Sequence, residues 1–383
     1  MIRKRLAIFS PGGIGGGAFA QGLPALGSLV AGLAASFDVT FYSLTSVDPG
    51  FSPPAGYRLR APSPTVEAVA SAIKGVRWAE MTRRFLADHL AARHDRLLSF
   101  WGYPVGAFVV GLSRTLGVPA AVMLLGAETA DVPAIGYGHL GRPLSRRLVI
   151  ETCRRAGALV AVSRYQLEAL AAHGFSRPDA HVVPIGAEAD LFPFEVDKGN
   201  ASSRTAPLKI LHVGNLTAVK DQATLLRAFA LLRGRIDARL RIVGEGSLRG
   251  DLETAIGALG IADAVEMTGA VPFAAMPDHY HWADMAALTS LSEGQNRSLT
   301  EAAMCGVLQV GTPVGHLADL GEAAAVLVRA GDPQNVADRI VEIAGDAAGW
   351  RRRVSAASAW AGAHDMDWTV DRMTEILEGL ARR

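Results

Sequence analysis

The feature that most constrains the fold is a unit that opens each half of the chain: a short apolar run, a glycine turn and a helical stretch. Residues 5–10 (RLAIFS) lead into the glycine loop at 11–17, and helical periodicity follows. Residues 208–213 (LKILHV) also end at a glycine, and a second helical stretch begins at Asp221. Continuous apolar runs are what strands covered on both faces require. Each half is therefore expected to begin as a strand–turn–helix unit.

Similar runs recur along the rest of the chain, and helical stretches separate most of them. They are 38–44, 96–101, 120–125, 158–163, 181–186, 239–244, 264–269, 285–290 and 307–311. Strand and helix alternating twice over predicts an α/β protein with two doubly wound parallel sheets, each a Rossmann-like domain. Ligands bind at the carboxyl ends of such strands, so the predicted site lies in a central cleft between two facing domains.

The boundary between the two domains is expected in the polar, turn-rich stretch 195–207 (EVDKGNASSRTAP). The first domain is then residues 1–195 and the second residues 205–364. A chain of 383 residues suits two domains of ordinary size. Residues 365–381 carry a helical apolar stripe that needs a partner surface.

Composition excludes several classes of protein. The net charge of +1 argues against a general nucleic-acid binder. Two cysteines, Cys153 and Cys305, rule out a disulfide scaffold and a four-cysteine zinc site, and they suit a reducing cytosol. The ten histidines are scattered, so no metal site is expected. No apolar run approaches the length of a membrane span, and a cytoplasmic protein is expected.

The first glycine loop contains Gly13, Gly15, Gly16 and Gly17 and allows three interpretations. It matches a GxGxxA dinucleotide fingerprint, but the strand at 38–44 does not end in the acidic residue that this fingerprint needs for the ribose. It could equally be a tight turn between strand and helix. A third interpretation is a loop without Cβ atoms, which lets the phosphates or the sugar of a substrate approach closely.

The segment 290–306 carries the stronger signal. Glu293 stands in a loop after a buried strand, and Glu301 stands in the first turn of a helix expected to begin near Ser298. Backbone amides at that helix start, with those of Ser298 and Leu299 foremost, could bind a diphosphate while each carboxylate accepts hydrogen bonds from hydroxyls. The alternative is a capping box, Ser298-Leu-Thr-Glu301, in which the Glu301 side chain only accepts a hydrogen bond from a free backbone N–H group at the helix start.

A lone lysine favours the interpretation as an anion site. Lys220 follows the strand at 208–213, after Gly214 and Asn215, and directly precedes a helix that Asp221 can cap. A lysine at a strand end can neutralise a diphosphate as a compact charge.

These residues resemble a known family. The chain is similar to the retaining glycosyltransferases of family 4, which have the GT-B fold and use nucleotide sugars. The resemblance is carried by 212–232, 241–253, 265–276, 283–306 and 310–320, and more loosely by 12–17, 161–170 and 181–192. It implies that Glu293 contacts hydroxyls of the donor sugar, that Glu301 contacts the ribose and that Lys220 binds the phosphates. The remaining motif residues, Gly294, Gln295, Asn296, Arg297, Ser298 and Leu299, are expected around the donor.

The resemblance also implies where the substrates bind. The donor, of the UDP or GDP type, would lie on the second domain and the acceptor on the first, with the terminal helix 365–383 packed back on the first domain. The base is expected near 268–272. Transfer would be a front-face reaction that retains the anomeric configuration, without a metal or another cofactor.

Two departures from the family pattern leave the activity open. Asn215 stands where the family often has an arginine, and Leu125 where it often has a histidine. Arg297 could replace the missing charge. Glu128 could replace the histidine as a sugar ligand, or it could be an exposed loop carboxylate. The alternatives to an active transferase are a nucleotide-sugar-binding protein without turnover and an NAD-type oxidoreductase.

The first half of the chain is basic, with six more lysine and arginine than acidic residues in 1–205. The stretches 71–96 and 141–157 are rich in arginine and allow two interpretations. They could contact an anionic membrane surface or a lipid-linked acceptor, or they could be helices packed on the sheet with their arginines in water. The turn-rich segment 127–141 is expected to be a loop near the acceptor, which could be a small molecule, a glycan or a lipid-linked sugar.

Overall fold

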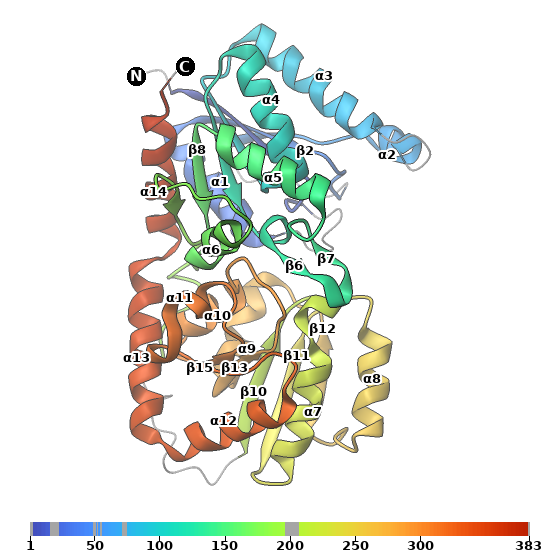
Figure 1. Ribbon diagram of the computed structural model, residues 1–383, viewed down its shortest axis with the longest axis vertical. Helices are drawn as coiled ribbons and strands as arrows, with labels where there is room; N and C mark the ends of the chain where they lie inside the picture. Colours follow the sequence, from blue (N-terminus) through green and yellow to red (C-terminus); the bar gives the residue numbers. More distant parts are fainter. Residues whose placement is uncertain are drawn as a thin grey trace.

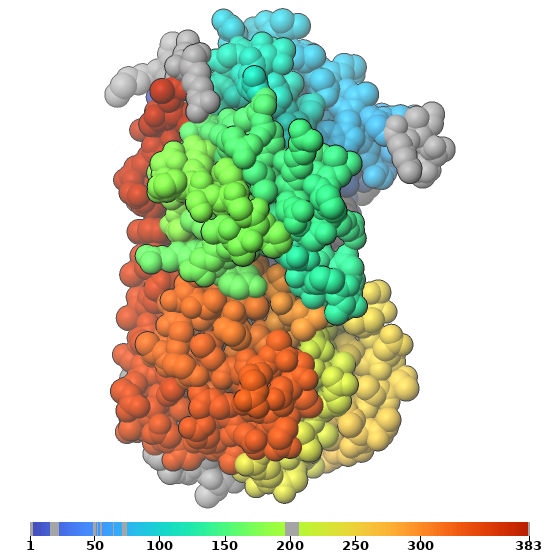
Figure 2. Space-filling model, in the orientation of Figure 1, coloured from blue at the N-terminus to red at the C-terminus, as the bar shows by residue number. Residues whose placement is uncertain are grey.

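The chain forms two α/β lobes stacked end to end, and one long helical stretch runs along the side of both (Figure 1). The computed structural model describes residues 3–15, 23–48, 51, 53, 56–70, 75–195 and 207–381. The predicted linker falls almost entirely outside the described residues, as do Gly16 and Gly17 of the glycine loop. On the face shown in Figure 2 the two lobes touch, where α6 (Arg164–Ala172) packs on α11 (His316–Leu320).

The first lobe contains a seven-stranded parallel sheet in the order β3-β2-β1-β4-β5-β8-β9. Its strands are β1 (Arg5–Ser10), β2 (Asp38–Ser43), β3 (Tyr57–Arg60), β4 (Arg96–Phe100), β5 (Ala120–Leu124), β8 (Ala158–Ala161) and β9 (His181–Val182). The helices are α1 (Pro24–Ser36), α2 (Pro64–Ala70), α3 (Val76–Ala91), α4 (Ala107–Leu116), α5 (Pro143–Arg155) and α6. The strand order reverses at β1, which places a topological switch point at the end of this strand.

The apolar run of β1 is buried on both faces, as its sequence predicts. Leu6 and Ile8 belong to the core under α1, whereas Ala7 and Phe9 belong to the core under α3 and α4. The Phe85 ring of α3 packs edge-on against the Phe9 ring, with 5.1 Å between ring centroids. Helices on both faces therefore explain why polar residues do not alternate along this strand.

Residues 76–91 of the arginine-rich stretch 71–96 form α3, which packs on the sheet through Met81, Phe85 and His89. Its arginines form ion pairs: Arg77 pairs with Glu67, and Arg83 and Arg84 both pair with Glu80. The second basic stretch forms α5. No helix among the described residues is both long enough and apolar enough to cross a membrane. Contact with a membrane surface stays a prediction.

The second lobe contains a six-stranded parallel sheet in the order β12-β11-β10-β13-β14-β15. Its strands are β10 (Leu208–Val213), β11 (Ala238–Val243), β12 (Val265–Gly269), β13 (Met285–Leu288), β14 (Leu308–Gly311) and β15 (Val326–Leu327). Its helices are α7 (Gln222–Arg233), α8 (Arg249–Ala258), α9 (Met276–Trp282), α10 (Arg297–Met304), α11, α12 (Pro333–Gly345) and α13 (Ala347–Ala363). This sheet again reverses its order at the first strand, β10, so both lobes are doubly wound as predicted.

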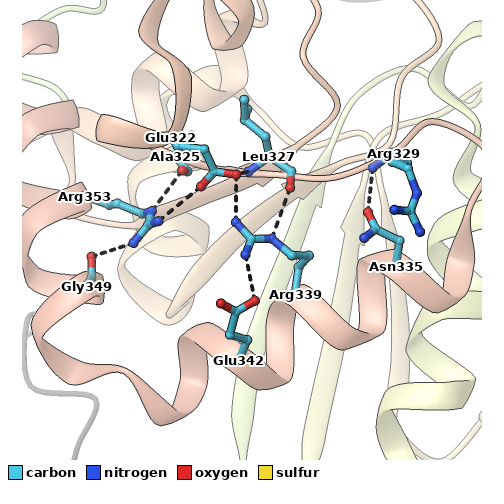
Figure 3. A network of polar contacts seen from close by, with 9 residues as sticks. All are labelled: Glu322, Ala325, Leu327, Arg329, Asn335, Arg339, Glu342, Gly349 and Arg353. Carbon is cyan, nitrogen blue, oxygen red and sulfur yellow. Dashed lines mark hydrogen bonds and ion pairs between the residues drawn. The ribbon is translucent and has the colours of Figure 1, made fainter.

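A polar network ties α12 and α13 to the edge of the second sheet (Figure 3). Glu322 forms ion pairs with Arg339 of α12 at 2.7 Å and with Arg353 of α13 at 3.1 Å. The same two guanidinium groups donate to the carbonyl oxygens of Leu327 and Ala325, respectively. The network fixes the two helices to the chain around β15.

The terminal helix α14 (Met366–Gly379) lies on the first lobe, against α1. Its residues Met373 and Leu377 belong to the same core as Leu6 and Ile8. The break between α13 and α14 falls at residues 364–365, where the chain crosses between the lobes. There the Gly186 amide donates to the Thr369 hydroxyl at 2.9 Å, and a Cβ on Gly186 would lie 2.1 Å from the carbonyl carbon of Asp365.

Some short elements were not expected from the sequence. The edge strands β3 and β15 were missed, and the predicted strand 181–186 is only two residues long as β9. The segment 127–141 contains a small antiparallel hairpin, β6 (Asp131–Val132) with β7 (Tyr137–Gly138), where a loop was predicted. Because these elements are short, their apolar periodicity is too brief to be recognised.

Candidate active site

A cavity of about 710 Å³ lies between the two lobes, at the carboxyl ends of both sheets. Residues of both lobes line it. The second lobe contributes Val213, Gly214, Asn215, Thr217, Lys220, Val243, Gly244, Glu245, Gly246, Ala270, Val271, Phe273, Met276, residues 293–298 and Glu301. This is the position that the doubly wound sheets predict, and the volume suits a nucleotide-sized ligand.

Lys220 and Glu293 meet at the centre of the second-lobe wall. The Lys220 Nζ atom lies 2.5 Å from Glu293 Oε1, and the Ser290 hydroxyl donates to the same oxygen at 2.6 Å. Both side chains are largely buried, with exposed fractions of 19% for Lys220 and 13% for Glu293. An ammonium group has three N–H donors, so Lys220 can hold Glu293 and still donate to a phosphate.

The backbone segments beside Lys220 pack closely against one another, which the glycines at two neighbouring strand ends permit. A Cβ on Gly244 would lie 2.0 Å from the Gly214 carbonyl oxygen, and one on Gly246 would lie 2.4 Å from that of Leu216. Gly244 also has a φ of +142°, which side chains other than hydrogen rarely permit. The sequence interpretation named Gly214 and Asn215 but missed Gly244 and Gly246, although the run RIVGEG marks the turn.

Helix α10 begins at Arg297, one residue earlier than predicted, and directs its amino end into the cavity. Asn296 precedes it in the left-handed region, with a φ of 74°, and no side chain caps the helix. The Leu299 amide donates to the Asn296 carbonyl at 3.0 Å, and the Leu299 side chain is buried in the core. The prediction that Leu299 binds the substrate is therefore wrong. Arg297 and Ser298 remain the helix-start residues that line the cavity.

Glu301 does not form the capping box that the sequence allowed as an alternative. Its Oε2 atom accepts a hydrogen bond from the Tyr280 hydroxyl at 2.6 Å, and its Oε1 atom lies 3.3 Å from Arg297 Nε. Burial raises the pKa of Glu301, while the Arg297 guanidinium and the Tyr280 hydroxyl oppose this shift. The carboxylate is thus held beside the helix start and is not turned back to cap it, and it lines the cavity.

Arg297 links the two lobes. Its Nη2 atom donates to Glu188 Oε2 at 2.6 Å, and the other oxygen of Glu188 accepts from the Ser28 hydroxyl of α1 at 2.5 Å. Arg297 therefore faces two carboxylates, Glu188 and Glu301, in the structure. This arrangement argues against its use as a free positive charge for the leaving group. Glu188 was not predicted from the sequence, because it lies 109 positions from Arg297.

The loop between Glu293 and α10 also docks on the first lobe. The Gln295 amide group pairs with the backbone of Ile185, donating to its carbonyl and accepting from its N–H, each at 2.7 Å. The Ser163 hydroxyl donates to the Gly294 carbonyl at 2.6 Å, and a Cβ on Gly294 would lie 2.3 Å from the Leu125 carbonyl. The Gln295 side chain is thus committed to the interface between lobes, where a substrate ligand was predicted.

The Asn296 side chain is likewise turned into the protein. It is 4% exposed, and in the amide orientation that satisfies both its oxygen and its nitrogen, the nitrogen donates to the carbonyl oxygens of Val314 and Gln295. It cannot also bind a substrate without losing these bonds. The residue itself lines the cavity, and its role as a substrate ligand stays a prediction.

Glu128 is neither a sugar ligand nor an exposed carboxylate. It is fully buried, and it accepts hydrogen bonds from three backbone amides, those of Leu125 at 2.7 Å, Gly126 at 3.0 Å and Gly102 at 3.1 Å. Its carboxylate holds the loops that follow β4 and β5. Both interpretations of Glu128 were wrong, because its carboxylate is enclosed by amides of its own loop and by the Gly102 amide from the end of β4.

Gly13 and Gly15 do not line the cavity. Both have positive φ, 99° and 70°, and their carbonyl oxygens accept from the amides of Leu23 and Asp48. A Cβ on Gly15 would lie 2.4 Å from the Phe51 ring. For these two glycines the structure favours a tight turn.

Buried histidines make the fold sensitive to acid. Burial lowers the pKa of His94, His212 and His316 to about 4, from an ordinary value of 6.5. The unfolded chain therefore binds protons between pH 6.5 and 4 that the folded chain does not. The stability that these groups contribute is present above pH 6.5 and is lost as pH falls towards 4, at up to about 3 kcal/mol for each histidine.

We expect the melting temperature to fall steadily from pH 6.5 to 4.5 at constant ionic strength. His316→Phe keeps a ring against Trp360, on which His316 stacks with 5.4 Å between centroids, and removes the titrating group. Its melting temperature should depend less steeply on pH. A flat profile for the wild type over this range would refute the prediction.

No group of three His, Cys, Asp or Glu side chains suited to a metal ion occurs within the part of the chain that the structure describes.

Comparisons with known proteins agree with this geometry. Residues 207–346 match the family described as glycosyl transferases group 1, and residues 24–186 match a glycosyl transferase 4-like domain. The D-inositol 3-phosphate glycosyltransferase of Segniliparus rotundus is 28% identical over 365 residues, which cover 86% of this chain and 78% of that protein. A GDP-mannose-dependent phosphatidylinositol monomannoside mannosyltransferase of Mycolicibacterium smegmatis is 28% identical and covers 69% of this chain and 75% of its own length.

Among solved structures, HepE of Anabaena in complex with UDP aligns over 98% of this chain and 100% of its own. The TM-score is 0.74 at 17% identity, a similarity that shows the fold alone. The predicted GT-B fold, two Rossmann-like domains facing a cleft, is thereby confirmed.

Proposed function

The chain belongs to the family 4 glycosyltransferases and takes a nucleotide-sugar donor, and on that basis we propose that it transfers a hexosyl unit with retention of configuration. The donor would be a UDP- or GDP-sugar bound mainly by the second lobe. The acceptor hydroxyl would approach from the first lobe. Contact of the basic first half with an anionic membrane face remains part of this proposal.

The proposed donor position follows from the second-lobe wall. The diphosphate would lie between Lys220 and the start of α10, where an ammonium group and helix-start amides converge on the cavity. Glu301 would accept the ribose hydroxyls, because Tyr280 and Arg297 orient its carboxylate. Glu293 would accept hydroxyls of the transferred sugar. The base would lie near Val271 and Phe273, which line the cavity beside the predicted segment 268–272.

In the proposed reaction the bond from the sugar C1 to the phosphate oxygen breaks while C1 bonds to the acceptor oxygen on the same face. The proton of the acceptor hydroxyl passes to the departing diphosphate, so atoms and charge balance. Lys220 and the amides at the start of α10 stabilise the negative charge that develops on the leaving group. These groups can neutralise the diphosphate, so we include in the proposal that no metal is required.

The observation that carries the proposal is the position of Lys220. Its amino group lies 2.5 Å from Glu293 in a cavity that also receives the start of α10. The test is a screen of UDP- and GDP-hexoses by mass spectrometry, with and without EDTA, using donor hydrolysis and transfer as readouts. The product's anomeric configuration is then read by NMR. Inversion of configuration at C1 would contradict the proposal that the enzyme retains configuration. Loss of activity with EDTA would contradict the proposal that no metal is required.

The alternative is a protein that binds nucleotide sugars without turnover. Two observations favour it: Leu125 lines the cavity where the family often has a histidine, and Glu128 is bound to backbone amides and cannot replace that histidine. Tight binding of an intact nucleotide sugar with no hydrolysis and no transfer would support this alternative.

A further inference from the structure

The described residues of the first-lobe wall are all hydrophobic, and the indole N–H of Trp101 is the one polar side-chain group among them. They are Leu23, Pro24, Ala25, Leu26, Trp101, Leu125, Val162 and Ile185. They come from the start of α1 and from the segments directly after β4, β5, β8 and β9. Each of these four strands thus delivers an apolar side chain at its carboxyl end, where a polar acceptor would need hydrogen-bonding groups.

The polar side chains at these strand ends bond within the protein. Glu128 accepts from three backbone amides, and the Ser163 hydroxyl donates to Gly294 across the interface. Gln166 is fully buried, accepts from the Val162 amide at 2.9 Å and donates to Thr129 at 3.2 Å. Leu23, Trp101 and Leu125, in contrast, are only partly buried and contact the cavity.

Cations line the cavity only on the other side, as far as the described residues show. Lys220 and Arg297 both belong to the second lobe, and both face carboxylates: Glu293 for the lysine, Glu188 and Glu301 for the arginine. A phosphate or carboxylate against the first-lobe wall would lose its water without gaining a partner, which is costly. The wall therefore selects against an anionic acceptor.

We propose that the acceptor is a neutral molecule whose hydroxyl is carried by a largely apolar body, aromatic or aliphatic, which packs on Leu23, Trp101 and Leu125. A phosphorylated sugar alcohol, of the kind in the name of the Segniliparus relative, does not fit this wall. This inference rests on the proposed function, since it takes the first lobe as the acceptor side. It concerns the acceptor alone and leaves donor binding unchanged.

The test compares two probes that share one apolar body, naphthol and naphthyl phosphate. Each is titrated by calorimetry into the protein saturated with UDP or GDP, whichever binds. For the wild type, naphthol should bind at least about tenfold more tightly than its phosphate ester, because only the ester must bury an unpaired charge. Equal or tighter binding of the ester, or no binding of either probe, would overturn the proposal.

A charge-insertion variant tests the same wall directly. Leu125→Arg adds a guanidinium where the acceptor body is expected, and it should shift the preference towards the ester by roughly ten- to a hundredfold. The matched control is Leu144→Arg on α5, where the leucine is 74% exposed and outside the cavity. It should behave as the wild type. An equal shift in both variants would mean that general charge sets the preference and would overturn the assignment.

A substitute variant and a nucleotide-binding control separate failure of the acceptor proposal from misfolding and from failure of the proposed function. Leu23→Arg, at another residue of the wall, replaces Leu125→Arg if the latter has lost its melting transition. Failure of every nucleoside diphosphate to bind the wild type would defeat the proposed function itself, whichever probe binds. Normal nucleotide binding without a preference for naphthol would defeat only the acceptor class.

Discussion

Lys220→Ala is expected to weaken the binding of a nucleoside diphosphate by about ten- to a hundredfold, because a close charge-assisted contact is worth roughly 1.5–3 kcal/mol. The amino group is largely buried between Glu293 and the cavity. Its removal takes one cation from the diphosphate site and leaves the Glu293 carboxylate with the Ser290 hydroxyl but without its ion-pair partner. Transfer should slow at least as much, because the charge on the leaving group grows during the reaction.

The matched control is Lys209→Ala, which removes a lysine near the opposite end of β10, outside the cavity. Calorimetry with UDP and GDP, together with a melting curve for each variant, separates the two lysines. The control should bind nucleotide as the wild type does. Equal nucleotide affinity in the Lys220 variant and the wild type would remove Lys220 from the site.

Glu293→Gln and Glu301→Gln are expected to impair different properties, turnover of the nucleotide sugar in the first case and nucleotide binding in the second. Glu301→Gln should weaken even the bare nucleoside diphosphate, since its proposed partner is the ribose. Glu293→Gln should leave that affinity nearly intact, and its cost, at least about tenfold in turnover, should appear only with the intact nucleotide sugar. The two carboxylates have different partners in the structure: Glu293 pairs with Lys220, and Glu301 pairs with Arg297.

The experiment measures binding of the diphosphate and of the nucleotide sugar to both variants, and the melting temperature of each. Equal losses for both ligands in the Glu293 variant would contradict its assignment to the sugar. A lower melting temperature in the Glu301 variant cannot reflect a lost helix cap, because α10 has no side-chain cap. If stability fell while nucleotide affinity stayed unchanged, Glu301 would serve only to hold Arg297 and Tyr280.

The fold was largely predictable because strands buried on both faces leave continuous apolar runs. The run at β1 illustrates this, since Leu6 and Phe9 are buried on opposite faces of the sheet. The break between α13 and α14 was also visible as the start of a new apolar stripe at 365–381. The hairpin of β6 and β7 was not predictable, because a strand of two residues is too short to show an alternation of apolar and polar residues.

The residues of the site could be predicted only where a single short segment of the sequence contains the pattern that identifies them. Glu293, Glu301 and Lys220 line the cavity as expected, because each stands at the end of a strand or the start of a helix. The partners of the intervening residues come from the other lobe: Gln295 binds Ile185, and Arg297 binds Glu188. Local sequence patterns carry no information on such pairs, which depend on how the lobes close against each other.

The most direct test of the donor site is a crystal structure of the protein with the nucleoside diphosphate that binds most tightly. We predict diphosphate oxygens within hydrogen-bond distance of Lys220 Nζ and of the backbone amides of Arg297 or Ser298, with a ribose hydroxyl at Glu301. A diphosphate bound instead at the glycine loop of the first lobe, with Lys220 still paired only to Glu293, would contradict the account.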